Sequence, residues 1–234
     1  GVLNFDQSGT FSTSGDFITR NGATTQLGFI PTQINVGGTF TQESGSTLDM
    51  TVGARPDIVA DHAILDGELV ISGFQRDTYP VKASEVEANP YTIIHTTGPL
   101  GISGNFTNQV GSDLGIDYLL EQGYISADNQ DYNIGFRMAW TDGGQSQVSG
   151  DFTLNDVNDA FNVDLALHDQ SVPSGGFDSG WSGTTLTKKG AGLLVLSALN
   201  TYSGKTDVMG GSLSLAGSGD IAASSQLLLS GSDS

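Results

Sequence analysis

The 234-residue sequence contains no cysteine, only six prolines, and eight lysines and arginines against 26 acidic residues. Without cysteine the chain has no thiol nucleophile, no Cys-ligated zinc and no disulfide. The net charge of −18 excludes nucleic acid as a partner, because phosphate attraction needs a basic face. No apolar run reaches the roughly 18–20 residues of a membrane span. The first ten residues lack the basic and apolar regions of a signal peptide, so none is expected in this sequence.

Apolar and polar residues alternate in short runs, for example over residues 48–52, 161–167 and 213–215. A period of two over four to eight residues predicts strands with one buried face. The 33 glycines, many of them in pairs, fall between these runs and predict turns. Only residues 83–88 and 118–122 could hold a helical turn. The sequence therefore predicts an all-β fold.

A short pattern with Phe and Thr begins at Gly38, Gly104 and Gly150, and each copy precedes an alternating strand. The strands carry Leu48, Met50 and Val52, then Leu114, Ile116 and Tyr118, then Phe161, Val163 and Leu165. The spacing of the copies corresponds to about three and about two units of about 22–23 residues. Units of this length are typical of the coils of a parallel β-helix. A β-sandwich is the alternative, but it does not require such a repeat.

Residues 123–149 interrupt the repeat with a polar turn, an alternating segment and a Gly-Gly pair. This pattern indicates either an inserted hairpin or a coil that is longer than average. The two interpretations are left open.

A longer motif occupies residues 185–215. Its positions are Leu186, Thr187, Lys188, Gly190, Gly192, Leu194, Leu196, Ser197, Asn200, Thr201, Tyr202, Gly204, Thr206, Val208, Gly211, Leu213 and Leu215. In this order they resemble the passenger-associated transport repeat of bacterial autotransporters, which are type V secretion proteins. Leu193 and Ala198 depart from the pattern, which usually has Thr and Gly there. Residues 38–215 also resemble, more loosely, the stems of pertactin-like and diffuse-adherence-type passengers.

The resemblance implies a right-handed parallel β-helix exported to the surface of a Gram-negative bacterium. It also implies a partner, the protein's own C-terminal outer-membrane β-barrel, which is expected beyond Ser234. Residues 1–182 would form a non-catalytic stem, and residues 183–234 would be autochaperone coils that continue the same solenoid and nucleate passenger folding. The leucines and valines of 193–196, 208, 213–215 and 227–229 make up the most apolar part of the chain and are predicted to form this nucleus.

An adhesive surface, for self-association or for a host ligand, is the alternative function, with residues 74–90 and 123–149 as first candidates for contacts. A polysaccharide-degrading enzyme is less favoured, because the eight basic residues do not pair with an acidic cluster. His62, His95 and His168 lie far apart in the sequence. The acidic segments 128–131 and 155–159 lack the spacing of a calcium loop. We therefore expect no catalytic, metal or cofactor site.

Overall fold

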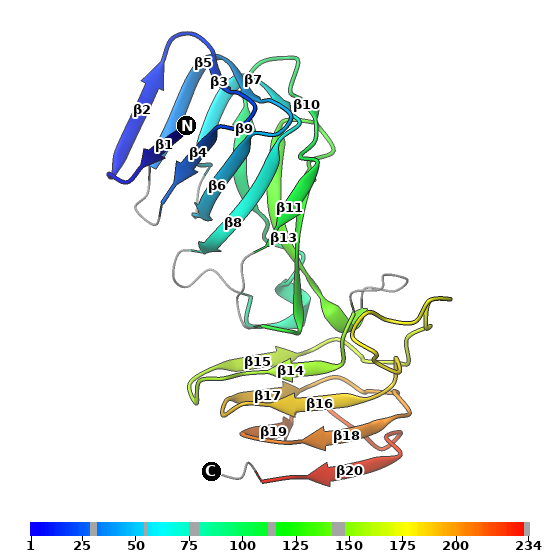
Figure 1. Cartoon of the computed structure of the whole chain (residues 1–234). Coiled ribbons are helices and arrows are strands. Elements are labelled where there is room, and N and C mark those ends of the chain that lie inside the picture. Colours follow the sequence, from blue (N-terminus) through cyan, green and yellow to red (C-terminus); the bar gives the residue numbers. More distant parts are fainter. Residues whose placement is uncertain (29–31, 54–55, 75–79, 112–115, 142–147, 232–234) are drawn as a thin grey trace. The chain divides into compact units, whose positions relative to one another are not determined.

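A computed structural model describes residues 1–28, 32–53, 56–74, 80–111, 116–141 and 148–231 (Figure 1). The chain divides into two compact units. Unit 1 comprises Gly1–Tyr79, Pro90–Leu114 and Glu121–Gly135, and unit 2 comprises Pro80–Asn89, Gly115–Leu120 and Phe136–Ser234. Both are built mainly of parallel strands that stack coil upon coil, which confirms the prediction of an all-β parallel solenoid.

Unit 1 is built on two sheets. The first contains β1 (Val2–Phe5), β4 (Thr24–Leu27), β6 (Thr47–Val52), β8 (Glu68–Phe74) and β11 (Asn108–Val110), in this order and all parallel. The second contains β2 (Gly9–Thr13), β5 (Thr32–Gln42), β7 (Ile58–Leu65) and β9 (Tyr91–Thr96), with β3 (Phe17–Thr19) beside β5 and β10 (Ile102–Gly104) beside β7. Val2 pairs with Thr24 and Thr24 with Thr47, so one coil has the predicted length of about 22–23 residues.

Unit 2 also carries two parallel sheets. One contains β14 (Asp151–Thr153), β16 (Leu186–Lys189), β18 (Lys205–Val208) and β20 (Gln226–Leu229); the other contains β15 (Ala160–Val163), β17 (Leu193–Leu196) and β19 (Ser212–Leu215). The short 3-10 helices η1 (Ala83–Glu85) and η2 (Ala139–Thr141) belong to this unit. The pairing of β14 with β16 and of β15 with β17 carries both sheets across the boundary expected between residues 182 and 183.

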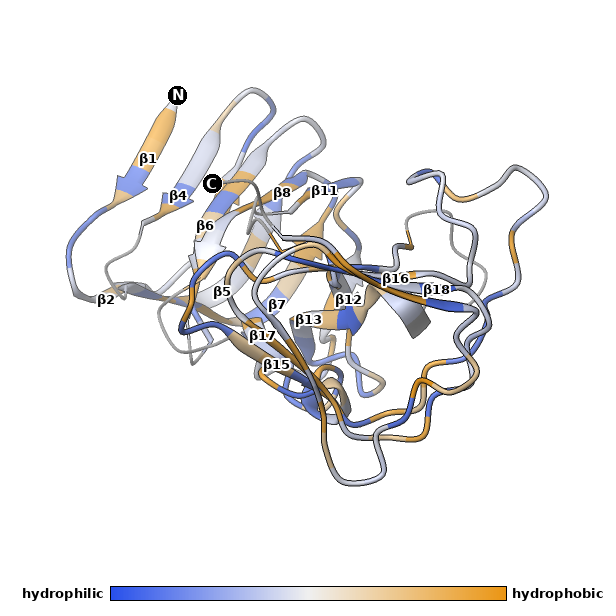
Figure 2. Cartoon of the chain, turned by 90° about the horizontal axis from the view of Figure 1, so that it is seen from below, coloured by the Kyte–Doolittle hydropathy of each residue, from blue (hydrophilic) through white to orange (hydrophobic). Residues whose placement is uncertain are grey.

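The core of unit 1 follows from the period of two. Strand β6 buries Leu48, Met50 and Val52 and turns the intervening polar residues outward, as predicted. Figure 2 colours the residues of the strands by their hydropathy. In the other sheet of unit 1, β5 and β3 stack Phe40 on Phe17, with ring centroids 5.7 Å apart. Phe40 and Phe17 show that a buried residue can stack on the equivalent residue of the next coil, which helps to bury both side chains.

A polar cluster that the sequence did not reveal lies in the same core. Gln42 is fully buried and donates to Thr19 Oγ1 at 2.9 Å, while Ser46 donates to Gln42 Oε1 at 3.0 Å. Thr19 and Thr25 share a further hydrogen bond of 2.7 Å. Because buried polar groups are costly only when unpaired, this chain of bonds lets polar residues occupy an inward position in successive coils.

The interruption at residues 123–149 is a pair of neighbouring strands, β12 (Leu119–Ile125) and β13 (Asp131–Met138). The Ser126 N–H donates to the Asp131 carbonyl oxygen at 2.8 Å, and Asn129 adopts a φ of 62° in the turn between the strands. Strand β13 then pairs antiparallel with β9. The hairpin interpretation is therefore confirmed, although residues 142–147, with the Gly-Gly pair, lie outside the described residues.

Of the two segments that could hold a helical turn, residues 83–88 contain the short helix η1, whereas residues 118–122 contain no helix because Leu119 begins β12. The strand predicted through Leu114, Ile116 and Tyr118 is also absent over 116–118, and Leu114 lies outside the described residues. In the described residues no helix is long and apolar enough to cross a membrane.

Candidate functional site

The motif at 186–215 spans strands β16 to β19 of unit 2. Its buried members are Leu186, Lys188, Gly192, Leu194, Leu196, Asn200, Tyr202, Thr206 and Val208. Register stacks Phe161, Leu194 and Leu213 in one column, and Val163, Leu196 and Leu215 in the next. Burial declines along the second column, since Leu196 is fully buried and Leu215 is 48% exposed. The predicted residues therefore lie together, but the earlier coil is the better buried one.

Asn200 ties three successive coils together at a corner. Its Oδ1 accepts the N–H of Leu167 at 2.9 Å, and its Nδ2 donates to the carbonyl oxygens of Ala198 at 2.9 Å and Asp220 at 3.0 Å. The side chain is buried, and its bond to the Leu167 N–H satisfies a buried backbone donor, while its other two bonds are part-buried. One amide thus links the coil before it, its own coil and the coil after it.

Tyr202 and Thr206 make a second polar connection. The Thr206 hydroxyl donates to Ser224 Oγ at 3.0 Å, so the Tyr202 hydroxyl, 2.6 Å from Thr206 Oγ1, donates to Thr206. Ser224 in turn donates to the carbonyl oxygen of Gly204 at 2.8 Å. Burial raises the pKa of the Tyr202 hydroxyl, and its bond to Thr206 offsets this only in part. The tyrosine therefore stays neutral and acts as a hydrogen-bond donor inside the coil.

Lys188 points inward although it is charged. It follows the buried Leu186 by two positions, its side chain is fully buried, and its ammonium meets main-chain carbonyl oxygens. Burial lowers the pKa of this ammonium. Its neighbour Gly190 has a φ of 72°, and a Cβ there would overlap the carbonyl oxygen of Leu154 in the previous coil. Only glycine fits this corner, which explains the glycine of the motif.

The sequence did not reveal the aspartates that fasten the corners of unit 2. Asp169 accepts both the N–H and the hydroxyl of Ser203 at 2.7 Å. Asp164 accepts the N–H of Ser84 at 2.8 Å and its hydroxyl at 2.6 Å. These partners are 34 and 80 residues apart, so no local motif marks them. The bonds are charge-assisted, since the acceptor is a carboxylate.

The Asp164 bonds predict a specific loss of stability in acid. Partial burial acts to raise the pKa of Asp164, but the bonds from Ser84 and the nearby Lys82 ammonium together lower it. A pKa that is lower in the folded state stabilises the fold above the unfolded-state pKa, and the effect is lost as the pH falls through the folded value. The unfolding free energy of the wild type should therefore exceed that of Asp164→Asn by about 0.5–1 kcal/mol at pH 7, because solvent screens this partly exposed carboxylate, and the difference should shrink as the pH falls toward 2.

Denaturant unfolding followed by tryptophan fluorescence measures this difference, because both tryptophans of the sequence, Trp140 and Trp181, lie in unit 2. Subtracting the variant removes the contribution of the other carboxyl groups. A difference that stays constant from pH 7 to pH 2 would show that the carboxylate charge does not contribute.

The other candidate residues are not brought together. His62 Nδ1 lies 2.5 Å from the Gly101 carbonyl oxygen, and His95 Nδ1 lies 2.7 Å from Asp131 Oδ1. The carbonyl oxygen of His168 accepts the indole N–H of Trp140. Within the described ranges, no group of three or more His, Asp or Glu side chains could hold a metal ion.

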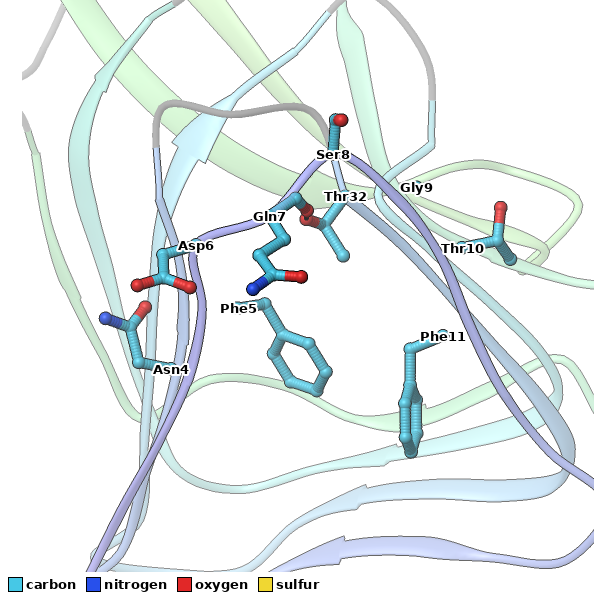
Figure 3. A pocket seen from close by; sticks show the side chains of 9 residues that line it. All are labelled: Asn4, Phe5, Asp6, Gln7, Ser8, Gly9, Thr10, Phe11 and Thr32. Atoms are coloured by element: carbon cyan, nitrogen blue, oxygen red, sulfur yellow. Dashed lines mark hydrogen bonds between the residues drawn. The ribbon is translucent and has the colours of Figure 1, made fainter.

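A cavity of about 350 Å³ lies at the first coil of unit 1 (Figure 3). Its apolar walls are Phe5 and Phe11, whose ring centroids are 5.3 Å apart, and Asp6 stands at its rim. Phe5 pairs with Leu27 and Phe11 with Ile34, both of which are buried. The cavity therefore lies against the hydrophobic core of the next coil.

Comparison with protein families supplies the remaining information. Residues 186–215 match the family model of the passenger-associated transport repeat. Neither the curated proteins nor the solved structures include a match. The pertactin-like or diffuse-adherence-type assignment stays a prediction. A transport repeat built into stacked parallel coils fits a region of a secreted autotransporter passenger.

Proposed function

We propose that this chain is a non-catalytic stem of an autotransporter passenger and that coils 183–234 nucleate its folding during secretion through the outer membrane. The partner in secretion is the translocator barrel that the transport repeat implies for the full protein. The three-coil bridge made by Asn200 carries the proposal, because it places a preformed set of donors and acceptors where the next coil must dock.

The physical basis is the one-dimensional contact pattern of a solenoid. Each coil pairs with its neighbours along the chain, as Leu194 does with Phe161 and Leu213. Stability is then a sum over coils and their interfaces, and folding spreads from whichever end forms first. A C-terminal coil held by buried polar bonds is suited to be the end that folds first. The stem role needs no reactive group.

The test uses the full-length precursor with its translocator barrel intact. We expect deletion of residues 183–234 to leave the passenger protease-sensitive or absent from the cell surface. The matched control deletes residues 24–46, one coil in register, since Thr24 pairs with Thr47. That deletion should leave a shorter passenger that is still displayed and protease-resistant.

A folded, protease-resistant passenger after deletion of 183–234 would contradict the autochaperone role. If cell clumping disappeared in that same strain, the segment would instead be an adhesive surface.

A further inference from the structure

The ammonium group of Lys188 lies inside unit 2 at a corner shared by two coils. Its Nζ donates to the carbonyl oxygens of Lys189 at 2.6 Å, Gly190 at 2.8 Å and Gly210 at 3.2 Å. The first two oxygens belong to its own coil and the third to the next coil. An ammonium has three N–H donors, so all of them are used.

The other lysines show how unusual this environment is. Lys189 pairs with Asp151 at 2.5 Å, Lys205 with Asp207 at 3.0 Å and Lys82 with Glu85 at 3.3 Å. The side chains of these three lysines are each at least 40% exposed. Lys188 is fully buried, and in the part of the chain that the structure describes no carboxylate lies within ion-pair distance of it. Burying an ammonium carries a large penalty unless polar groups replace its water. Here main-chain oxygens do so.

The backbone explains why these oxygens face inward. Gly190 and Gly211 have φ values of 72° and 61°, so the chain reverses at the equivalent corner of each coil. The carbonyl oxygen of Lys189 also accepts the Leu154 N–H at 3.1 Å. Among the described residues, the Lys188 ammonium is the hydrogen-bond donor to the carbonyl oxygens of Gly190 and Gly210. The corner thus forms a cage of carbonyl dipoles whose negative ends face the Lys188 ammonium.

We propose that the Lys188 ammonium acts as an internal cation that joins coil 205–211 to coil 186–190. The charge of this group, not the volume of the side chain, holds the two coils together. The register of the strands places Lys188 between Phe152 and Val208, which supply its apolar surroundings. The part that this junction plays in secretion rests on the proposed function. The junction itself does not.

Chemical rescue separates charge from volume. Lys188→Ala removes three methylene groups and the ammonium, and n-propylammonium has the same four heavy atoms. We expect the unfolding equilibrium constant of unit 2 to rise roughly 100-fold or more in Lys188→Ala, because a buried carbonyl pair loses its donor. Added n-propylammonium should reverse most of this rise, whereas 1-propanol, neutral and of similar size, should not.

Tryptophan fluorescence during urea unfolding is the measurement, since Trp140 and Trp181 both lie in unit 2. Wild-type protein in the same additives corrects for solvent effects, and Lys189→Ala, at the exposed neighbouring position, is the matched control. An unchanged urea midpoint in Lys188→Ala would overturn the proposal. A lowered midpoint that propylammonium and propanol restore equally, or that neither restores, would also overturn it.

Lys188→Met decides the matter if Lys188→Ala does not fold even with propylammonium. Methionine keeps the volume and removes the charge, so we expect its midpoint to fall well below that of Lys189→Met. An equal midpoint would overturn the proposal. These measurements use isolated protein, so their failure leaves the autochaperone test in the precursor unaffected, and the reverse also holds.

Discussion

Leu194→Ala is expected to destabilise unit 2 by about 2–5 kcal/mol, the usual range for truncating a buried leucine. Leu194 is fully buried between Phe161 and Leu213 in neighbouring coils, so the missing methyl groups leave a cavity that the paired strands cannot close. Leu215→Ala, in the last residue of β19, should lower the unfolding free energy by less than about 1 kcal/mol, because Leu215 is already 48% exposed.

Urea unfolding monitored by tryptophan fluorescence gives both values. Equal losses for the two variants would mean that Leu215 is covered in the folded protein. Refolding rates of the same variants locate the nucleus. If coil 186–196 forms first, Leu194→Ala slows refolding, whereas a nucleus elsewhere makes it act mainly on the unfolding rate.

The alternation of apolar and polar residues predicted most of the fold, because every coil buries one face of its strands in the same way. Phe161, Val163, Leu194 and Leu196 alternate with outward residues, and each is buried in the structure. The repeat beginning at Gly104 misled because the chain inserts the hairpin β12–β13 after β11. There Phe106 leaves the strand pattern and packs edge-on against Tyr132, with centroids 5.0 Å apart. A contact with the hairpin thus replaces the expected coil, and local sequence does not encode this choice.

The sequence predicted which positions of the motif at 186–215 matter, but not which contacts their side chains make. Alternation from Leu186 already places position 188 inward, yet a lysine there conflicts with the usual exposure of charged residues. This conflict was the available signal for a buried cation. The bonds of Asp164 to Ser84 and of Asp169 to Ser203 had no such signal, because the coil lengths that align them depend on irregular loops.

Asn200→Ala is expected to lower the unfolding free energy of unit 2 by about 2–3 kcal/mol, because it leaves the buried Leu167 N–H without its acceptor, which costs about 1–3 kcal/mol. The part-buried carbonyl oxygens of Ala198 and Asp220 also lose a donor, although the Asp220 oxygen still accepts the main-chain N–H of residue 200. The matched control is Asn158→Ala. Asn158 is exposed in a turn of the same unit and bonds only to the nearby Asp156, so its loss should be about 0.5 kcal/mol or less.

Amide hydrogen exchange distinguishes the bridge from general packing. In Asn200→Ala the Leu167 amide should exchange much faster relative to its wild-type rate than the strand amides of β17 do, because its acceptor is the deleted side chain. The amides of unit 1 should be unchanged. If Asn200→Ala and Asn158→Ala proved equally stable, water would be replacing the amide at this corner. The docking of the next coil would then depend on the Leu194 column and the Lys188 cage rather than on Asn200.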